Sequence, residues 1–187
     1  MRLGIFGGTF DPPHVGHLLV AVDAVEQLTL DRLVFVPTAS QPLKLGIVRA
    51  TATQRLAMVR LLAGDDARFE VDPIEIERPG LSYSVDTLAE YARQNPDAER
   101  FFIVGADVIR TFDKWREPER VLSLAKMVVL TRDDALVSLP VGATALRSRR
   151  VDVSSTEIRA RVAARQSLRG FVPQPVADYI AAERLYR

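Results

Sequence analysis

The stretch from Gly7 to His17, GGTFDPPHVGH, constrains the fold of this chain more than any other feature. It follows a short apolar run that predicts a buried strand, and it precedes apolar residues spaced like one face of a helix. Glycines let the backbone approach a ligand closely, prolines stiffen the exit, and free N–H groups at a helix start favour an anion. The stretch is therefore predicted to be a strand-to-helix turn that can hold a phosphate.

The only two histidines of the chain, His14 and His17, lie in this turn. A separation of three residues lets both imidazoles face the same side of a helix start. A sharp loop with capping or surface histidines would give the same pattern. No Lys-Ser/Thr pair follows the glycines and the Gly-x-Gly-x-x-Gly spacing is absent, so the sequence predicts neither a P-loop nor a dinucleotide-binding fingerprint.

Composition places the chain among ordinary globular proteins. Its 187 residues predict one domain over 1–187, with a C-terminal helical segment from about residue 154. Apolar runs are too short to span a bilayer, and the amino end has no signal-like segment, so a cytoplasmic location is expected. The absence of cysteine excludes disulfides and thiolate metal sites. A net charge of +1 gives no general attraction to nucleic acid, although the seven arginines in 147–170 could either bind phosphates or form a solvated helix face.

Strand-like and helix-like segments alternate along the chain. This order predicts an α/β fold, a Rossmann-like, open and mainly parallel sheet with helices on both faces. Strands are expected at residues 3–6, 32–37, 68–72, 101–104, 126–131 and 151–153, with a weaker candidate at 74–77. Helices are expected from 18 to 28, after a cap at Thr51 or Thr53, through 88–92, over 118–125, from 154, and over 176–185; the stretch before residue 146 is predicted to be loop.

Three further segments have both a structural and a functional interpretation. Asp107 follows the strand at 101–104, and at that edge of an open α/β sheet a carboxylate could bind a ligand or cap the next helix. Trp115, the only tryptophan, could be core or ligand contact. Ser154 and Glu157 match a capping box, yet the hydroxyl-rich SSTEIR segment also suits a triphosphate.

Four segments, GGTFDPPHVGH, RPGLSYSVDT, FFIVGADVIRTFDKW and VSSTEIR, together resemble bacterial nicotinate-nucleotide adenylyltransferase. That family joins nicotinate mononucleotide to ATP in NAD synthesis. The resemblance covers essentially the whole chain. The His-x-Gly-His and Ser-Ser-Thr-x-Ile-Arg motifs mark the nucleotidyltransferase superfamily, whereas Ser-Tyr-Ser-x-Asp-Thr with Gly-x-Asp and the downstream tryptophan indicates this branch.

The resemblance implies a role for each motif. It implies ATP contacts from Gly8, Thr9, Phe10, His14, His17, Gly105, Asp107, Ser154, Ser155, Thr156 and Arg159. It implies mononucleotide contacts from Lys44, Tyr83, Thr87 and Trp115, and catalytic roles for His14, His17, Lys44 and Arg159. The chain departs from the family pattern at Leu43, where many members have histidine, so a polar contact from that loop is missing or comes from elsewhere.

The implied reaction needs no enzyme nucleophile. Cysteine is absent and no serine–histidine–acid order is apparent, so we expect direct in-line attack of the mononucleotide phosphate on the ATP α-phosphorus. Mg²⁺ is expected to be held mainly by ATP phosphates and water, with no protein metal site. The expected partners are ATP and nicotinate mononucleotide, without nucleic acid or membrane, and homo-oligomerisation stays open. The alternatives are an adenylyltransferase for phosphopantetheine or nicotinamide mononucleotide, and a nucleotide sensor without turnover.

Overall fold

A computed structural model describes residues 1–40, 48–131, 139–149 and 151–187. Within them, six strands form one sheet in the order β3-β2-β1-β4-β5-β6, and every pairing is parallel. The strands are β1 (Arg2–Gly8), β2 (Arg32–Pro37), β3 (Phe69–Val71), β4 (Glu99–Gly105), β5 (Lys126–Thr131) and β6 (Thr144–Arg147). The predicted Rossmann-like parallel sheet is confirmed.

The strand order reverses at β1, which pairs with β2 on one side and β4 on the other. Gly8 lies opposite Pro37 in this register, so β1 and β2 end together, and β4 ends at Gly105 on the same edge. Open α/β sheets bind ligands beyond the carboxyl ends of their strands, at the point where the order reverses. The topology therefore places the glycine turn where a ligand site is expected.

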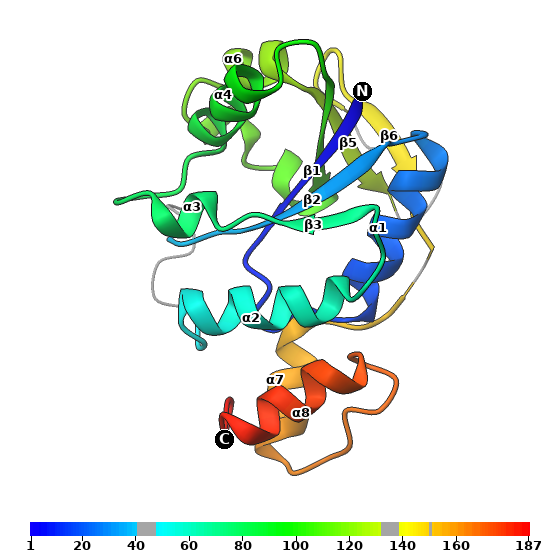
Figure 1. Cartoon of the computed structure of the whole chain (residues 1–187), viewed down its shortest axis with the longest axis vertical. Coiled ribbons are helices and arrows are strands. Elements are labelled where there is room, and N and C mark those ends of the chain that lie inside the picture. Colours follow the sequence, from blue (N-terminus) through cyan, green and yellow to red (C-terminus); the bar gives the residue numbers. More distant parts are fainter. Residues whose placement is uncertain (41–47, 132–138, 150) are drawn as a thin grey trace.

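Helices cover both faces of the sheet (Figure 1). One face carries α1 (Val15–Gln27) and α2 (Ala52–Ala63), and α7 (Ser155–Ala163) and α8 (Gln174–Ala182) join the same core, with α8 against α2. The other face carries α4 (Ser84–Gln94) and α6 (Pro118–Leu124). Shorter turns are α3 (Ile74–Glu77), α5 (Ala106–Ile109) and the 3₁₀ turn η1 (Phe112–Lys114). No helix among the described residues is long and apolar enough to cross a membrane.

The central strands are buried on both faces, and alternate residues enter different cores. Phe35 contributes to the α1/α2 side, whereas Val34 and Val36 contribute to the α4/α6 side. The same alternation separates Ile103 from Phe102 on β4. This two-sided burial explains why the sequence of these strands is a continuous apolar run.

The start of α2 follows its sequence signal. The Thr51 hydroxyl accepts the Gln54 N–H at 3.2 Å, and the Gln54 side-chain oxygen accepts the Thr51 N–H at 3.0 Å. The reciprocal pair satisfies two N–H groups that the first helical turn leaves open. Thr51, rather than Thr53, is therefore the cap.

Two predicted strands were wrong. Residues 74–77 form the single helical turn α3, because the Asp72 carboxylate accepts the Ile74 N–H and Pro73 allows the chain to coil after it. The last strand is β6, in the segment predicted to be loop, whereas residues 151–153 are irregular. Only Leu146 of β6 is buried, so this edge strand lacks the apolar alternation that would reveal it.

Candidate active site

A pocket opens beyond the carboxyl ends of β1, β2 and β4. Gly8, Thr38 and Gly105 mark these three strand ends in its wall. The complete lining is Ile5, Gly7, Gly8, Val36, Thr38, Glu75, Ser82, Tyr83, Ser84, Thr87, Phe102, Val104, Gly105, Lys114, Trp115 and Arg116. The wall thus combines apolar strand residues with hydroxyl, acidic and basic groups from the surrounding loops, as small-molecule sites commonly do.

The structure brings together three of the four residues predicted for the mononucleotide, Tyr83, Thr87 and Trp115. Trp115 contacts the rings of Phe112 and Phe102, with centroids 5.5 and 6.2 Å away, and it also lines the pocket. The core and ligand interpretations of Trp115 are therefore compatible. Across the pocket, the Arg116 guanidinium carbon lies 4.9 Å from the centre of the Tyr83 ring.

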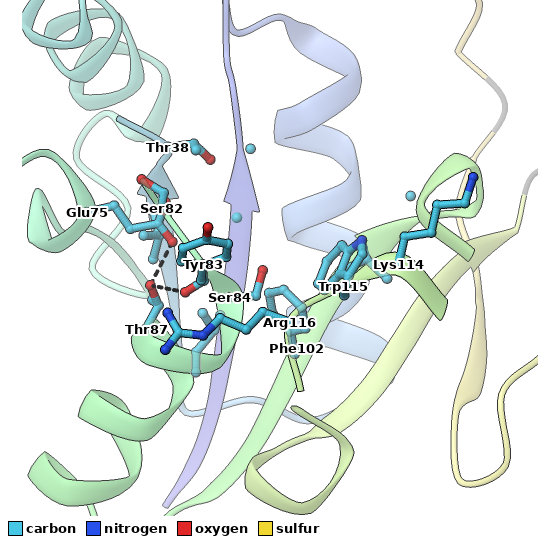
Figure 2. A pocket seen from close by; sticks show the side chains of 16 residues that line it. Thr38, Glu75, Ser82, Tyr83, Ser84, Thr87, Phe102, Lys114, Trp115 and Arg116 are labelled. Atoms are coloured by element: carbon cyan, nitrogen blue, oxygen red, sulfur yellow. Dashed lines mark hydrogen bonds between the residues drawn. The ribbon is translucent and has the colours of Figure 1, made fainter. Parts of the chain in front are cut away.

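Thr87 is buried and bound to a residue that the sequence analysis missed. Its hydroxyl donates to Glu75 Oε1 at 2.8 Å and accepts from Arg78 Nη2 at 3.0 Å. Glu75 is only 7% exposed and faces the pocket from α3 (Figure 2). Burial raises the pKa of the Glu75 carboxyl, while the hydroxyls of Thr87, Ser82 and Thr38 and the charge of Arg78 oppose this shift.

The two histidines lie against each other at the start of α1, with ring centroids 3.8 Å apart. The backbone N–H of His14 donates to Nδ1 of His17 at 3.1 Å, so a neutral His17 carries its ring proton on Nε2. Burial lowers the pKa of His17 well below its ordinary value, and the neighbouring His14 lowers it further. His17 is therefore a neutral imidazole at pH 7.

Phe10 supports the turn from the core side. Its backbone is in the left-handed region, at φ 51°, and its ring packs edge-on against His17 at 5.0 Å. A Cβ on Gly8 would lie 2.8 Å from the Phe10 ring, so the ring can sit under the turn only because residue 8 is glycine. With the Phe10 side chain only 2% exposed, a contact with ATP would have to come from its backbone.

The SSTEIR segment docks on the same turn from the far end of the chain. The Ser155 hydroxyl donates to the Pro12 carbonyl at 2.8 Å, and Arg159 Nη1 donates to the Asp11 carbonyl at 2.8 Å. Arg159 Nη2 also donates to the Thr156 hydroxyl at 3.2 Å. Ser154 caps α7 by accepting the Glu157 N–H at 3.1 Å, and Ser154 and Thr156 are exposed. The segment therefore does both: Ser154 caps α7, and Ser155 and Arg159 contact the turn.

Two buried charges below the turn were also missed. Arg55, 1% exposed on α2, donates to the carbonyls of Thr9 and Ala39 at 2.8 and 3.1 Å. The Asp11 carboxylate accepts the N–H groups of residues 49 and 50 at 2.7 and 3.0 Å, and the Tyr186 hydroxyl at 2.8 Å. These contacts tie the turn to α2 and to the C-terminal tail. No short motif marks them, since the partners lie 16 to 175 residues apart.

Two predicted site residues are not placed by the structure. Lys44, like the departure at Leu43, lies in 41–47, outside the described residues. The backbone of Asp107 belongs to α5, but its side chain is also outside what the structure describes. Their implied roles stay predictions.

A parallel sheet with its order reversal beside a glycine turn, two histidines and a pocket of mixed apolar and polar lining defines a nucleotide-binding α/β protein of the nucleotidyltransferase class. The family model described as "Cytidylyltransferase-like" matches residues 5–161. A protein of Gemmatimonas aurantiaca named "Probable nicotinate-nucleotide adenylyltransferase" is 52% identical over 197 residues, covering 100% of this chain and 93% of the relative. A protein of the same name from Thermus thermophilus is 45% identical over 188 residues, covering all of both. The chain belongs to the nicotinate-nucleotide adenylyltransferase family, within the cytidylyltransferase-like enzymes.

A solved structure agrees with the fold. The Plasmodium falciparum nicotinic acid mononucleotide adenylyltransferase complexed with NaAD superimposes with a TM-score of 0.80. The alignment covers 99% of this chain and 97% of that one, at 17% sequence identity. At this identity the likeness concerns the architecture.

Proposed function

We propose that this enzyme transfers the adenylyl group of ATP to nicotinate mononucleotide, giving nicotinate adenine dinucleotide and pyrophosphate. The observation that carries the proposal is the position of two candidate subsites at one sheet edge. The histidine turn follows β1, and the pocket with Trp115 and Thr87 opens beside the ends of β1 and β4. The names of the relatives support the choice of substrates.

ATP would lie over the turn between β1 and α1. A neutral His17 offers its Nε2–H to a phosphate oxygen, because Nδ1 is already an acceptor for the His14 N–H. Arg159, beside the turn, supplies a permanent positive charge for the triphosphate. Gly105 at the end of β4 leaves room for the adenosine ribose, for which Asp107 is the predicted partner.

Nicotinate mononucleotide would fill the pocket beside the turn. Trp115 is held by Phe112 and Phe102, so its indole is preorganised for stacking on a pyridine ring. Tyr83 and Thr87 lie opposite, where the ring carboxylate would be bound. Lys114 and Arg116, both on the rim, favour an anionic ligand.

The reaction follows from this placement. The mononucleotide phosphate is itself a nucleophile, so it attacks the ATP α-phosphorus, the new P–O bond forms, and the bond to pyrophosphate breaks. The protein contributes position and hydrogen bonds to the charged oxygens rather than a strong base. In this mechanism, His14 and His17 stabilise the transferred group.

Magnesium would arrive on ATP. Among the described residues, no three His, Asp or Glu side chains gather into a possible metal site. Mg²⁺ prefers phosphate oxygens and water over all-protein cages, and when bound it neutralises charge on the β- and γ-phosphates. The residues present fit a metal carried by the substrate. A cytoplasmic location stays a prediction.

The test is pyrophosphate release with ATP and Mg²⁺, comparing nicotinate mononucleotide, nicotinamide mononucleotide and phosphopantetheine. We expect a strong preference for nicotinate mononucleotide. Activity on phosphopantetheine alone would keep the reaction type and overturn the assignment of the Trp115 pocket. Tight ATP binding with no turnover of any acceptor would instead indicate a sensor.

A variant separates the two subsites. Trp115→Ala removes the stacking surface, so the KM for the mononucleotide should rise about tenfold or more while the KM for ATP changes little. Equal increases in both KM values would remove the stacking role.

A further inference from the structure

Glu75 is a buried acid in the pocket where an anionic ring substituent is expected to bind. It comes from the single turn α3, and its side chain reaches the pocket between Thr38, Ser82 and Thr87 (Figure 2). A buried carboxylate facing a bound carboxylate would be strongly unfavourable. Either Glu75 is therefore protonated when the anionic ring substituent binds, or Glu75 has a different role in the pocket.

The hydrogen bonds distinguish the two oxygens of Glu75. Oε1 accepts the Thr87 hydroxyl at 2.8 Å, whereas Oε2 is buried and has no hydrogen-bond partner among the described residues. The Ser82 hydroxyl lies nearby, but its oxygen already accepts the N–H groups of Ala39 and Ser40 at 3.2 and 3.4 Å. A proton on Oε2 therefore finds no free acceptor in Ser82, and the Thr38 hydroxyl, which also lies beside Glu75, is the neighbouring group that competes with a ligand for this proton.

The same hydrogen bonds limit Thr87. Its oxygen accepts from Arg78, and its single proton goes to Glu75 Oε1, which is closer than the Tyr83 carbonyl at 3.4 Å. A hydroxyl has one proton to donate. Thr87 consequently has no proton left for a substrate carboxylate while Glu75 accepts it, and a protonated Oε2 becomes a side-chain donor at this end, beside the Tyr83 phenol.

Charged groups surround Glu75 from several elements. Arg78 follows it on the chain, and Arg55 lies beneath from α2 and interacts with it electrostatically. Lys114 and Arg116 line the same pocket with the Tyr83 phenol. Asp72, before α3, is occupied by the Ile74 N–H and the Tyr91 hydroxyl. Burial nevertheless dominates and raises the pKa of Glu75, which favours its neutral form.

We propose that Glu75 determines the specificity of this pocket, as a neutral acid whose Oε2–H donates to the carboxylate of bound nicotinate mononucleotide. When ionised, it repels that carboxylate and accepts a hydrogen bond from the amide of nicotinamide mononucleotide. This inference rests on the proposed reaction and adds a residue to its recognition. It makes the choice between acid and amide substrates depend on pH.

The test is the ratio of kcat/KM for nicotinate mononucleotide to kcat/KM for nicotinamide mononucleotide, from about pH 5, just above the ordinary range of a glutamate, to about pH 9. Both substrates carry the same phosphate, so its titration and that of the histidines cancel in the ratio. The ratio should fall about tenfold or more as pH rises through the pKa of Glu75. In Glu75→Gln it should be independent of pH, because the amide cannot ionise but still donates.

Glu77→Gln is the matched control, because Glu77 is exposed on the same helical turn. It should keep the pH profile of the unmodified enzyme. A flat ratio in the unmodified enzyme, or an unchanged slope in Glu75→Gln, would overturn the proposal. A ratio in Glu75→Gln above that of the unmodified enzyme at every pH would also overturn it, since Glu75 would then be ionised throughout. If neither mononucleotide released pyrophosphate, the proposed function itself would fail, a result distinct from a flat ratio.

Discussion

The C-terminal tail is predicted to stabilise the histidine turn through one hydrogen bond, from the Tyr186 hydroxyl to Asp11 Oδ1 at 2.8 Å. Tyr186→Phe deletes this donor and keeps the ring. Hydrogen bonds to charged groups contribute about 1.5–3 kcal/mol, and we expect the lower end because Asp11 keeps two backbone N–H donors. At ~2–4 °C per kcal/mol for a chain of this size, Tm should fall by roughly 3–8 °C.

Urea unfolding and thermal melts measure this loss. Tyr179→Phe on α8 is the control, because the Tyr179 hydroxyl makes no hydrogen bond within the described chain. The KM for ATP should also rise in Tyr186→Phe, since the carbonyl of Asp11 holds Arg159 beside the turn. If the free energies of unfolding of the two variants differ by less than about 0.5 kcal/mol, the tail does not stabilise the turn.

Three substitutions test the turn itself. His17→Ala should lower kcat by about 10²–10³ without unfolding the protein, and near-normal turnover would exclude His17 from the mechanism. The pKa of His17 is lowered in the folded state, so neutral His17 contributes fully to stability above its pKa in the unfolded chain, about 6.5, and this contribution is lost as pH falls. Between about pH 8 and about pH 5.5, the free energy of unfolding should therefore decrease less in His17→Ala than in the unmodified protein. Arg159→Lys should reduce kcat/KM for ATP about tenfold, because an ammonium cannot donate both to the Asp11 carbonyl and to a phosphate in the same fork geometry, and an unchanged value would refute this. Gly8→Ala should cost about 1–3 kcal/mol in urea unfolding, because its Cβ would meet the Phe10 ring at 2.8 Å.

The sequence predicted the parts of the fold that depend on local signals. β2 and β5 have the bounds expected from their apolar runs, and Thr51 caps α2 as its side chain suggests. The turn after β1 and the pocket residues Tyr83, Thr87 and Trp115 also lie at one edge, as their motifs implied. The single-domain organisation stays a prediction, supported by Ile180 of α8, which shares a core with sheet residues.

The missed features depend on contacts between distant segments. In the Ile-Glu-Ile-Glu segment 74–77, alternation of apolar and acidic residues indicated a strand, so nothing marked Glu75 as a buried pocket residue. Arg55 looks like an ordinary helical arginine until α2 places it under the turn, where it reaches the Thr9 carbonyl. Edge strand β6 buries only Leu146 and therefore gives no apolar pattern. Such features arise from tertiary placement, which periodicity does not encode.

The long-range contacts explain how a short turn can present itself to a triphosphate. Backbone carbonyls repel phosphate oxygens, so a turn that binds anions must direct its carbonyls elsewhere. Three of them, from Thr9, Asp11 and Pro12, are held by Arg55 of α2 and by Arg159 and Ser155 of α7. Two of these donors are guanidinium groups, which also bring positive charge beside the proposed phosphate site. The glycine and histidine motif therefore supplies the groups that face ATP, whereas α2 and α7 determine which way the turn faces.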